Sequence, residues 1–217
     1  MDKIIDLTYD IEEGMTTFNA HWHPTVSIKQ LGRLGFEGRE TRKISLGTHT
    51  GTHVDAPLHF IKNGKTIDQI PLQKLIGQVT IVNYSNLKEN QPVTVEMLRR
   101  VKVSTKMLFK FGWGRFWGNK KFYTGYPYFT KEAAEYLVSK KVELIGIDIP
   151  SPDNSNTKLG SKEDSQIHKI FLKNGIILVE YLANLEKVTD YESWNIVVLP
   201  LKIKGADGSP ARVFIYK

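Results

Sequence analysis

The sequence predicts a single α/β domain built around a substantial mixed sheet with few helices. Three observations support this fold class. Apolar and β-branched runs of strand length recur along the whole chain, helical patterns are fewer, and no Pro/Ser/Gly-rich linker divides the 217 residues. A chain of this length can bury a proper hydrophobic core. We therefore expect one domain spanning residues 1–217.

The strands are predicted from short runs rich in Val, Ile, Leu, Phe and Tyr. They outnumber the helical segments and alternate with them, which favours an α/β or α+β arrangement. The expected strands lie near Lys3–Leu7, Thr25–Leu31, Lys43–Leu46, Val79–Tyr84, Met107–Phe111, Leu144–Ile147, Ile176–Glu180, Ile196–Ile203 and Ala211–Tyr216.

Helices are predicted where a capping residue precedes an apolar stripe at helical spacing. One candidate cap is a capping box, in which a serine and a carboxylate three residues later exchange bonds with backbone N–H groups. Glycine is the usual residue just past a helix end. The predicted helices are Val95–Val101 after Thr94, Lys131–Lys140 after Thr130, and a third that the box Ser161–Asp164 opens and Gly175 ends.

Composition excludes several classes of protein. There is no cysteine, so disulfides and thiolate metal sites are ruled out. The sequence shows neither a signal peptide nor an apolar run of ~20 residues, so we expect a cytoplasmic protein with no membrane contact. The net charge is +7, but the lysines are scattered, so we expect no nucleic-acid partner. The alternative is that this positive field attracts an anionic substrate.

Half of the six histidines fall within residues 49–60, HTGTHVDAPLHF. Imidazole nitrogens and carboxylate oxygens are the usual ligands of a divalent cation such as zinc. Glycine, threonine and Pro57 disfavour a helix here, so we expect a strand that runs into a tight loop. His53 and Asp55 would point the same way, and Gly51 would let His49 turn beside them. Such an N,N,O set leaves open coordination positions, as catalytic metal sites do.

Two residues farther along the chain are candidates for the same centre. Glu180 lies in an otherwise apolar run, where an isolated carboxylate is costly. A metal, a lysine partner or a strand end in solvent would each relieve that cost. His168 lies beside Ile167 and Ile170, where a half-buried histidine with ordinary partners is the commoner case. The residues alone leave both roles open.

HTGTHVDAPLHF resembles the signature H-x-G-T-H-x-D-x-P-x-H-F of the cyclase family of metal-dependent hydrolases, which includes bacterial kynurenine formamidase (arylformamidase) and isatin hydrolase. GIDIPSPD, residues 146–153, is similar to the family's G-I-D-x-P-S-x-D segment. His168 with residues 173–185, and residues 200–202 with 205–212, resemble its remaining blocks. The resemblance covers the chain from about Ile4 to its end.

The resemblance implies a swivelling β/β/α fold, a homo-oligomer (dimer or tetramer) and two divalent metal ions per subunit. Zinc is the expected metal and manganese the alternative. The implied site residues are His49, His53 and Asp55 for the first ion, Asp55 as a bridge with His168 and Glu180 for the second, His59 as general acid/base, and Phe18 as the substrate-contacting aromatic residue.

Such a site predicts hydrolysis of a C–N bond in a small aromatic amide. Metal-activated hydroxide would attack the carbonyl, and His59 would protonate the leaving nitrogen. The implied reaction converts N-formylkynurenine to kynurenine and formate. The alternatives are a cyclic-amide hydrolase of the isatin type and a non-catalytic metal-binding protein of the same fold.

Two segments of the sequence leave the identity of the substrate undecided. After Phe18 the chain reads Asn19-Ala20-His21, where kynurenine formamidases usually carry P-G-D, so His21 or Trp22 is a further candidate contact. Between Trp113 and Phe129 there are eight aromatic residues, with glycines interspersed among them. This composition favours a loop that packs over another part of the protein or over a ligand. That segment is predicted to be a pocket wall or lid, or else a subunit interface or ordinary aromatic cluster.

Overall fold

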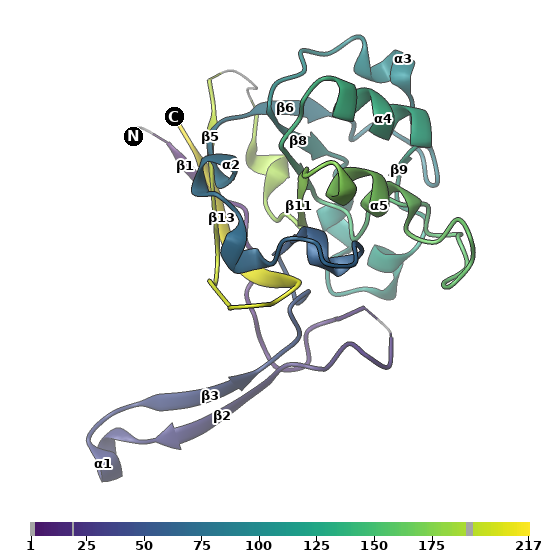
Figure 1. The fold of residues 1–217 in the computed structure, drawn as a ribbon. Coiled ribbons are helices and arrows are strands. Elements are labelled where there is room, and N and C mark those ends of the chain that lie inside the picture. The colour runs from purple at the N-terminus through teal and green to yellow at the C-terminus, as the bar shows by residue number, and fades with distance from the viewer. Residues whose placement is uncertain (1–2, 19, 190–192) are drawn as a thin grey trace.

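The computed structural model describes residues 3–18, 20–189 and 193–217. Its centre is a mixed nine-stranded sheet in the order β5-β12-β13-β4-β11-β10-β8-β6, and β1 pairs with β13 off this path (Figure 1). The mixed α/β fold class is confirmed. The strands of this sheet are β1 (Ile4–Asp6), β4 (His53–Asp55), β5 (Ile76–Gln78), β6 (Thr80–Asn83), β8 (Lys106–Lys110), β10 (Leu144–Ile147), β11 (Ile177–Glu180), β12 (Asn195–Pro200) and β13 (Gly208–Tyr216).

The sheet has a parallel half and an antiparallel half. β6, β8, β10 and β11 run parallel, whereas β4, β13, β12 and β5 pair antiparallel. The middle residues of the parallel strands are apolar because both faces of these strands are covered. On β8, for example, Met107 and Phe109 enter one hydrophobic core and Leu108 enters the other.

Two helices cover one face of the parallel half (Figure 1). They are α4 (Lys131–Ser139) and α5 (Gln166–Lys173). Thr130 caps α4 as predicted, because its hydroxyl accepts a hydrogen bond from the backbone N–H of Ala133 at 3.1 Å. Within the described ranges, no helix is both long enough and apolar enough to cross a membrane.

The predicted capping box at Ser161–Asp164 is wrong. α5 begins only at Gln166, and Ser165 before it is left-handed, with φ 53°. The first turn is capped by a distant carboxylate instead: the Asp153 oxygens accept from the backbone N–H groups of Ile167 and His168. A long-range cap has therefore replaced the local one. The helix ends before Gly175, whose φ of 72° fits the expected glycine stop.

The remaining elements are short. The predicted helix after Thr94 is only a single turn, α3 (Val95–Leu98), and Thr94 makes no side-chain cap there. Several elements had no prediction: α2 (Leu72–Leu75), β5, the two-stranded pair β7 (Pro92–Val93) and β9 (Tyr128–Phe129), and the 3₁₀ turns Pro57–His59, Ile67–Gln69, Trp113–Phe116, Lys120–Tyr123 and Leu185–Lys187.

One hairpin stands away from this body (Figure 1). It consists of β2 (Ser27–Gly32), the single turn α1 (Leu34–Glu37) and β3 (Thr41–Ser45), and we call residues 27–45 the arm. The strands near Thr25–Leu31 and Lys43–Leu46 were predicted. What the sequence pattern did not show is that they pair only with each other and join no other sheet.

Candidate active site

The histidine-rich segment forms β4 at the centre of the main sheet. β4 lies between β11 and β13, with Glu180 directly opposite His53 and Gly208 directly opposite Asp55. The extended strand points His53 and Asp55 to the same side, as predicted. Sheet pairing therefore brings residues that are far apart in sequence to one place.

The His53 and His168 rings each have one nitrogen anchored and one facing carboxylates. His53 Nδ1 lies 2.8 Å from the carbonyl oxygen of Gly51, whose positive φ of 60° aims that carbonyl. His168 Nδ1 lies 2.6 Å from Asp153 Oδ2. Anchors of this kind fix the tautomer and orientation of metal-binding histidines. The Nε2 atoms of both rings are left facing Asp55 and Glu180.

The distances around Asp55 are short. His53 Nε2 lies 3.3 Å from Asp55 Oδ1 and 3.5 Å from Glu180 Oε2. His168 Nε2 lies 3.1 Å from Glu180 Oε1 and 3.4 Å from Asp55 Oδ2. His49 Nδ1 lies 2.7 Å from Asp55 Oδ1. All five predicted ligands are thus brought together.

His49 and His59 share a partner that the sequence analysis did not identify. Asp207 Oδ2 lies 2.8 Å from His49 Nε2 and 3.2 Å from His59 Nδ1. The next residue must be glycine, because a Cβ at Gly208 would lie 2.8 Å from the His49 ring. His59, in the 3₁₀ turn Pro57–His59, stacks on His49 at a centroid distance of 3.8 Å.

Burial and the charges of neighbouring residues shift the pKa values of His49, Asp55 and Glu180 in the metal-free chain. Burial opposes charge on His49, but Asp55 and Asp207 outweigh it and raise the pKa of His49 to about 10. Burial likewise opposes charge on Asp55, yet the charges of His49 and His59 hold its pKa well below the usual value. Burial, followed by the nearby charge of Asp55, raises the pKa of Glu180. Strongly coupled, buried acids and imidazoles are typical of functional sites.

The donor set fits a divalent metal. Asp55 Oδ2 is completely buried and has no hydrogen-bond partner, a costly state that a cation would relieve. Two groups of residues each bring their candidate ligand atoms within 4.8 Å of one another, and both groups contain Asp55: His49–Asp55–His59 and His53–Asp55–Glu180. A carboxylate shared by two groups is the arrangement that a bridged metal pair requires. The geometry places His59 in one of these groups, beside its expected role in proton transfer.

A cavity of about 850 Å³ opens onto this centre. His49, His53, His59, His168 and Glu180 lie on its wall, so it leads from solvent to the carboxylates. A cavity of this size suits a small aromatic molecule. Its aromatic lining residues are Phe18, Trp22, Phe60, Tyr123, Tyr126 and Tyr181, and among its described lining residues there is no lysine or arginine.

The aromatic segment between Trp113 and Phe129 contributes both to the hydrophobic core and to the cavity wall. Trp113, Phe122 and Phe129 are buried in the main core, which fits the ordinary-cluster alternative. Tyr123 and Tyr126 line the cavity, which fits the pocket-wall alternative. Phe18 lies in the same wall, with its ring 6.2 Å from that of Tyr123. Asn19 lies outside the described residues, Trp22 also lines the cavity, and the exposed His21 does not.

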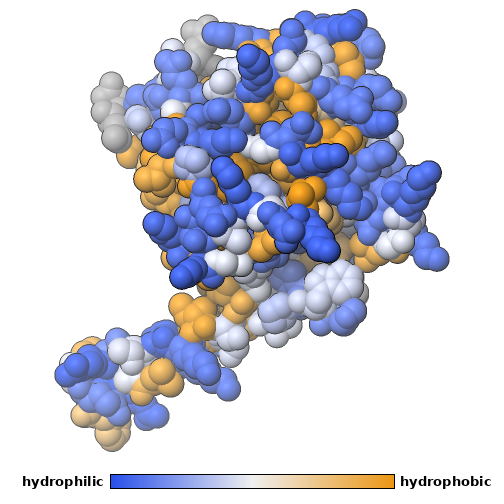
Figure 2. All heavy atoms as spheres, viewed as in Figure 1, coloured by the Kyte–Doolittle hydropathy of each residue, from blue (hydrophilic) through white to orange (hydrophobic). Residues whose placement is uncertain are grey.

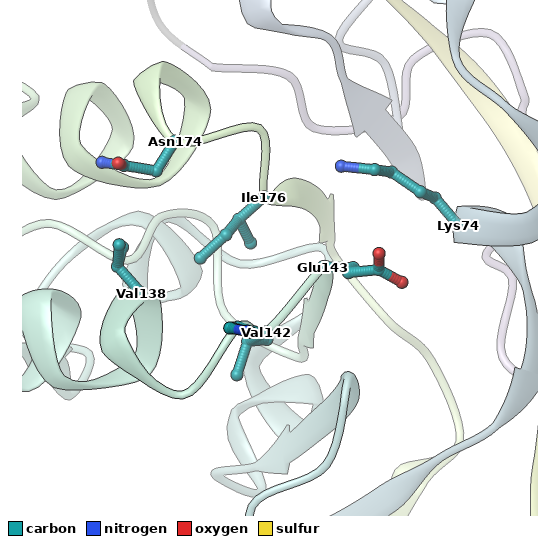
Figure 3. A pocket seen from close by; sticks show the side chains of 7 residues that line it. Lys74, Val138, Val142, Glu143, Asn174 and Ile176 are labelled. Carbon is teal, nitrogen blue, oxygen red and sulfur yellow. The ribbon is translucent and has the colours of Figure 1, made fainter.

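A second hollow lies at the opposite end of the parallel strands (Figure 3). Lys74, Glu143 and Ile176 are among its lining residues, and the last two precede β10 and β11. Ligands of open α/β sheets bind at the carboxyl ends of the strands, where Glu180 ends β11. This hollow has a volume of about 350 Å³ and no histidine among its described lining residues, so it is a poorer candidate for the active site than the larger cavity.

Known proteins resemble the chain in sequence and in fold. The Cyclase family model matches residues 5–154. Kynurenine formamidase of Bacillus thuringiensis subsp. konkukian (strain 97-27) is 34% identical over 173 residues, which cover 80% of this chain and 78% of that protein. Isatin hydrolase A from Ralstonia solanacearum has the same fold, with a TM-score of 0.86 and 23% identity over 98% of this chain and 91% of that chain.

A third similar protein is named for metal chemistry. It is a predicted metal-dependent hydrolase from Bacillus stearothermophilus, with a TM-score of 0.78 and 27% identity over 98% of this chain and 97% of that chain. The family model spans well over half of the 217 residues and includes the whole histidine-rich segment. The chain therefore belongs to the cyclase family.

Proposed function

We propose that this protein is a metal-dependent amidohydrolase that cleaves an aryl formamide, with N-formylkynurenine as the first substrate to test. The chain is a hydrolase of non-peptide C–N bonds, as its kynurenine formamidase relatives indicate. The observation that carries the proposal is the convergence of three imidazoles and the Glu180 carboxylate around the buried Asp55 carboxylate, beside an aromatic cavity.

Each residue has a proposed role. His49, His53, Asp55, His168 and Glu180 would hold two divalent ions, with zinc favoured by nitrogen and oxygen ligands without thiolate and manganese as the alternative. Bound there, the ions would polarise the amide carbonyl and bring the pKa of water near neutrality. His59, held by Asp207 at the cavity wall, would protonate the leaving nitrogen. Phe18 and Tyr123 would pack against the aromatic ring of the substrate.

A second candidate is opening of a cyclic amide such as isatin. The cavity lining is compatible with it, because uncharged isatin needs no lysine or arginine and the described lining contains neither. A non-catalytic metal protein would not need His59 at the cavity wall. We further propose that the enzyme works in the cytoplasm as a homo-oligomer, on a small molecule and not on nucleic acid.

The test is a substrate panel on protein whose metal content has been measured by elemental analysis. N-formylkynurenine, isatin and simple aryl esters would be offered to the metal-loaded enzyme. We expect about two divalent ions per chain and turnover of the formamide. Turnover of isatin alone would move the assignment to the second candidate, and turnover of none would remove the hydrolase assignment.

A further inference from the structure

Tyr181 has a backbone conformation that tyrosine rarely adopts. Its φ is 57°, in the left-handed region that favours glycine. Among the described non-glycine residues with positive φ, it is the only aromatic one. It directly follows Glu180, the last residue of β11. Strained residues of this kind cluster at active sites, where the surrounding structure holds them in place.

The left-handed turn places the Tyr181 ring beside the proposed metal ligands. Along an extended strand, successive side chains point to opposite faces of the sheet, so the residue after Glu180 would point away from the cavity. Instead, Glu180 and Tyr181 both line the cavity. The Tyr181 ring lies edge-to-face with the His53 ring, at a centroid distance of 5.0 Å and an interplanar angle of 89°. His53 is the residue that pairs with Glu180 across the sheet.

A buried hydroxyl fixes the backbone of this turn. Thr52 Oγ1 donates to the carbonyl oxygen of Tyr181 at 2.6 Å and accepts from the backbone N–H of Tyr9 at 3.0 Å. Thr52 directly precedes His53, the first residue of β4. Its hydrogen bond therefore joins the two strands beside their ligands, and movement of Tyr181 would shift Glu180 relative to His53.

The Tyr181 ring is also held by neighbouring aromatic residues. Figure 2 shows hydrophilic residues over much of the visible face of the main body. Tyr181 adds almost nothing to the surface of the protein, because only 4% of it is exposed. Its ring lies edge-to-face with Phe122 at 5.3 Å and with Trp117 at 6.0 Å, and its hydroxyl hydrogen-bonds with Tyr123. A ring packed in this way restricts the rotation of the His53 imidazole beside it.

The turn by itself does not require a tyrosine, because glycine would make it without strain. What the tyrosine adds is a ring against His53. We propose, on the basis of the metal centre of the proposed function, that Tyr181 is a positioning residue for that centre. Its backbone sets the end of β11 and its ring sets the orientation of the imidazole. His53 and Glu180, which belong to different ions of the proposed pair, thereby keep their spacing around Asp55.

Zinc affinity and the absorption spectrum of the cobalt-loaded protein test this role. Tyr181→Leu keeps an apolar side chain but removes the ring. We expect its zinc affinity, measured by competition with a chromophoric chelator, to fall roughly 10–100-fold, as for other residues that orient metal ligands. The d–d absorption bands of bound cobalt, which report the ligand geometry, should shift. Tyr181→Phe keeps the ring and should retain both the zinc affinity and the cobalt spectrum.

The matched control is Phe129→Leu. Phe129 is buried in the same hydrophobic core as Tyr181, but its ring packs against Phe109, Phe111 and Phe171. This variant should lose stability in urea while keeping its zinc affinity and its cobalt spectrum. If circular dichroism shows that Tyr181→Leu does not fold, Tyr181→Met takes its place with the same expected result, because methionine fills irregular gaps in a core.

Three outcomes would overturn the positioning role. They are unchanged zinc affinity and cobalt spectrum without the ring, an equal loss of affinity in Phe129→Leu, and an equal loss in Tyr181→Phe. An unmodified protein that binds neither zinc nor manganese would overturn the proposed function as well. None of these readouts uses turnover, so a protein that binds metal as expected but hydrolyses no formamide would contradict the proposed function alone.

Discussion

His59 and His49 stack with their ring centroids 3.8 Å apart and contact the same carboxylate oxygen, Asp207 Oδ2. Only His49 also makes a hydrogen bond to Asp55. The pair therefore separates two roles: His49 faces the buried carboxylates, whereas His59 remains on the cavity side. The carboxylate that joins them lies one residue before β13, the strand that pairs with β4.

Replacement of His59 by alanine should remove proton transfer while leaving the metal in place. General acid–base catalysis contributes roughly 10²–10⁴-fold, and a fall of that size in kcat is expected. Metal content by elemental analysis should match the unmodified enzyme. His21→Ala is the control, because that histidine is exposed and lies outside the cavity lining. Loss of a metal ion from His59→Ala would instead make His59 a ligand, as its grouping with His49 and Asp55 allows.

Replacement of Asp207 by asparagine should weaken the contacts that orient His49 and His59. Partners that orient metal ligands are worth about 10–100-fold in metal affinity or activity, so both should fall by that range. Thr48→Val should have the same effect in smaller degree, because its hydroxyl donates to Asp207 Oδ1 at 2.9 Å. Asp68→Asn serves as the control: it accepts from the backbone of nearby Gly205 but contacts no histidine. Equal effects of Asp68→Asn and Asp207→Asn would count against the orienting role.

The parts of the fold that repeat a local pattern were predictable from the sequence. Leu144–Ile147 is a strand with the predicted bounds, and Thr130 caps the predicted helix. The histidine-rich segment forms the expected strand, with Gly51 in a left-handed turn. In these cases the hydrophobic period, the cap and the glycine conformation are decided by neighbours in sequence.

The residues that the sequence analysis missed act over long range. Asp153 caps α5 and holds His168, and Asp207 holds His49 and His59. Neither acid is near its partner in sequence, so no local pattern marks the pairing. The signal that could have found them was present: both lie in the two blocks that resemble the family, as acids without an assigned role. Likewise, nothing in the run 27–45 shows that its strands leave the main sheet.

Metal binding should release protons and weaken in acid. Without metal, both ring nitrogens of His49 face carboxylates, and its pKa of about 10 means that the ring is protonated at neutral pH. A metal must displace that proton, so affinity should rise with pH until about pH 10. Titration calorimetry at pH 7.5 in two buffers of different ionisation enthalpy will measure the number released. A heat independent of buffer would show that no proton leaves.

Removal of the metal should lower the stability of the fold. The buried carboxylates Asp55 and Glu180 lose their counter-charge, and ligands that bind only the folded state stabilise it. A chelator should therefore lower the melting temperature, and restored zinc or manganese should raise it. Glu180→Gln should abolish most of this dependence on metal, whereas Glu186→Gln, at an exposed residue, should not. An identical melting temperature with and without metal would contradict a buried metal centre.

Asp148 should make stability fall as pH rises through the weakly acidic range. Its carboxylate is buried and accepts from the backbone N–H groups of Phe111 and Gly112, yet burial still raises its pKa to about 6 from 3.8. The folded state therefore holds the proton more tightly than the unfolded state does. The associated stability is complete below pH 3.8 and is lost as pH rises through 6, a change of about 3 kcal/mol.

Urea unfolding of metal-free Asp148→Asn and the unmodified protein at several pH values between 4 and 7 will isolate this contribution. The other buried groups are common to both chains and cancel in the difference. As pH rises, the free energy of unfolding of the variant should increase relative to that of the unmodified protein, whatever the absolute stability of the variant. A difference that is constant with pH would show that Asp148 does not titrate in this range.

The cavity should discriminate against substrates that carry a carboxylate on the aromatic ring. Its described lining includes Asp164 and Asp207 but no lysine or arginine, so a carboxylate on the ring would lose water without gaining a lysine or arginine partner. A matched pair tests this: 4-formamidobenzamide is uncharged, and 4-formamidobenzoate has nearly the same shape and one negative charge. We expect kcat/KM, measured by formate release, to be at least about tenfold higher for the amide, which corresponds to about 1.4 kcal/mol. Salt screens exposed charges, so the ratio of the two kcat/KM values should narrow at high ionic strength if Asp164 and Asp207 contribute. A preference for the benzoate would contradict this expectation and would mean that the ring carboxylate reaches a cation at the site, such as protonated His49 or a bound metal ion.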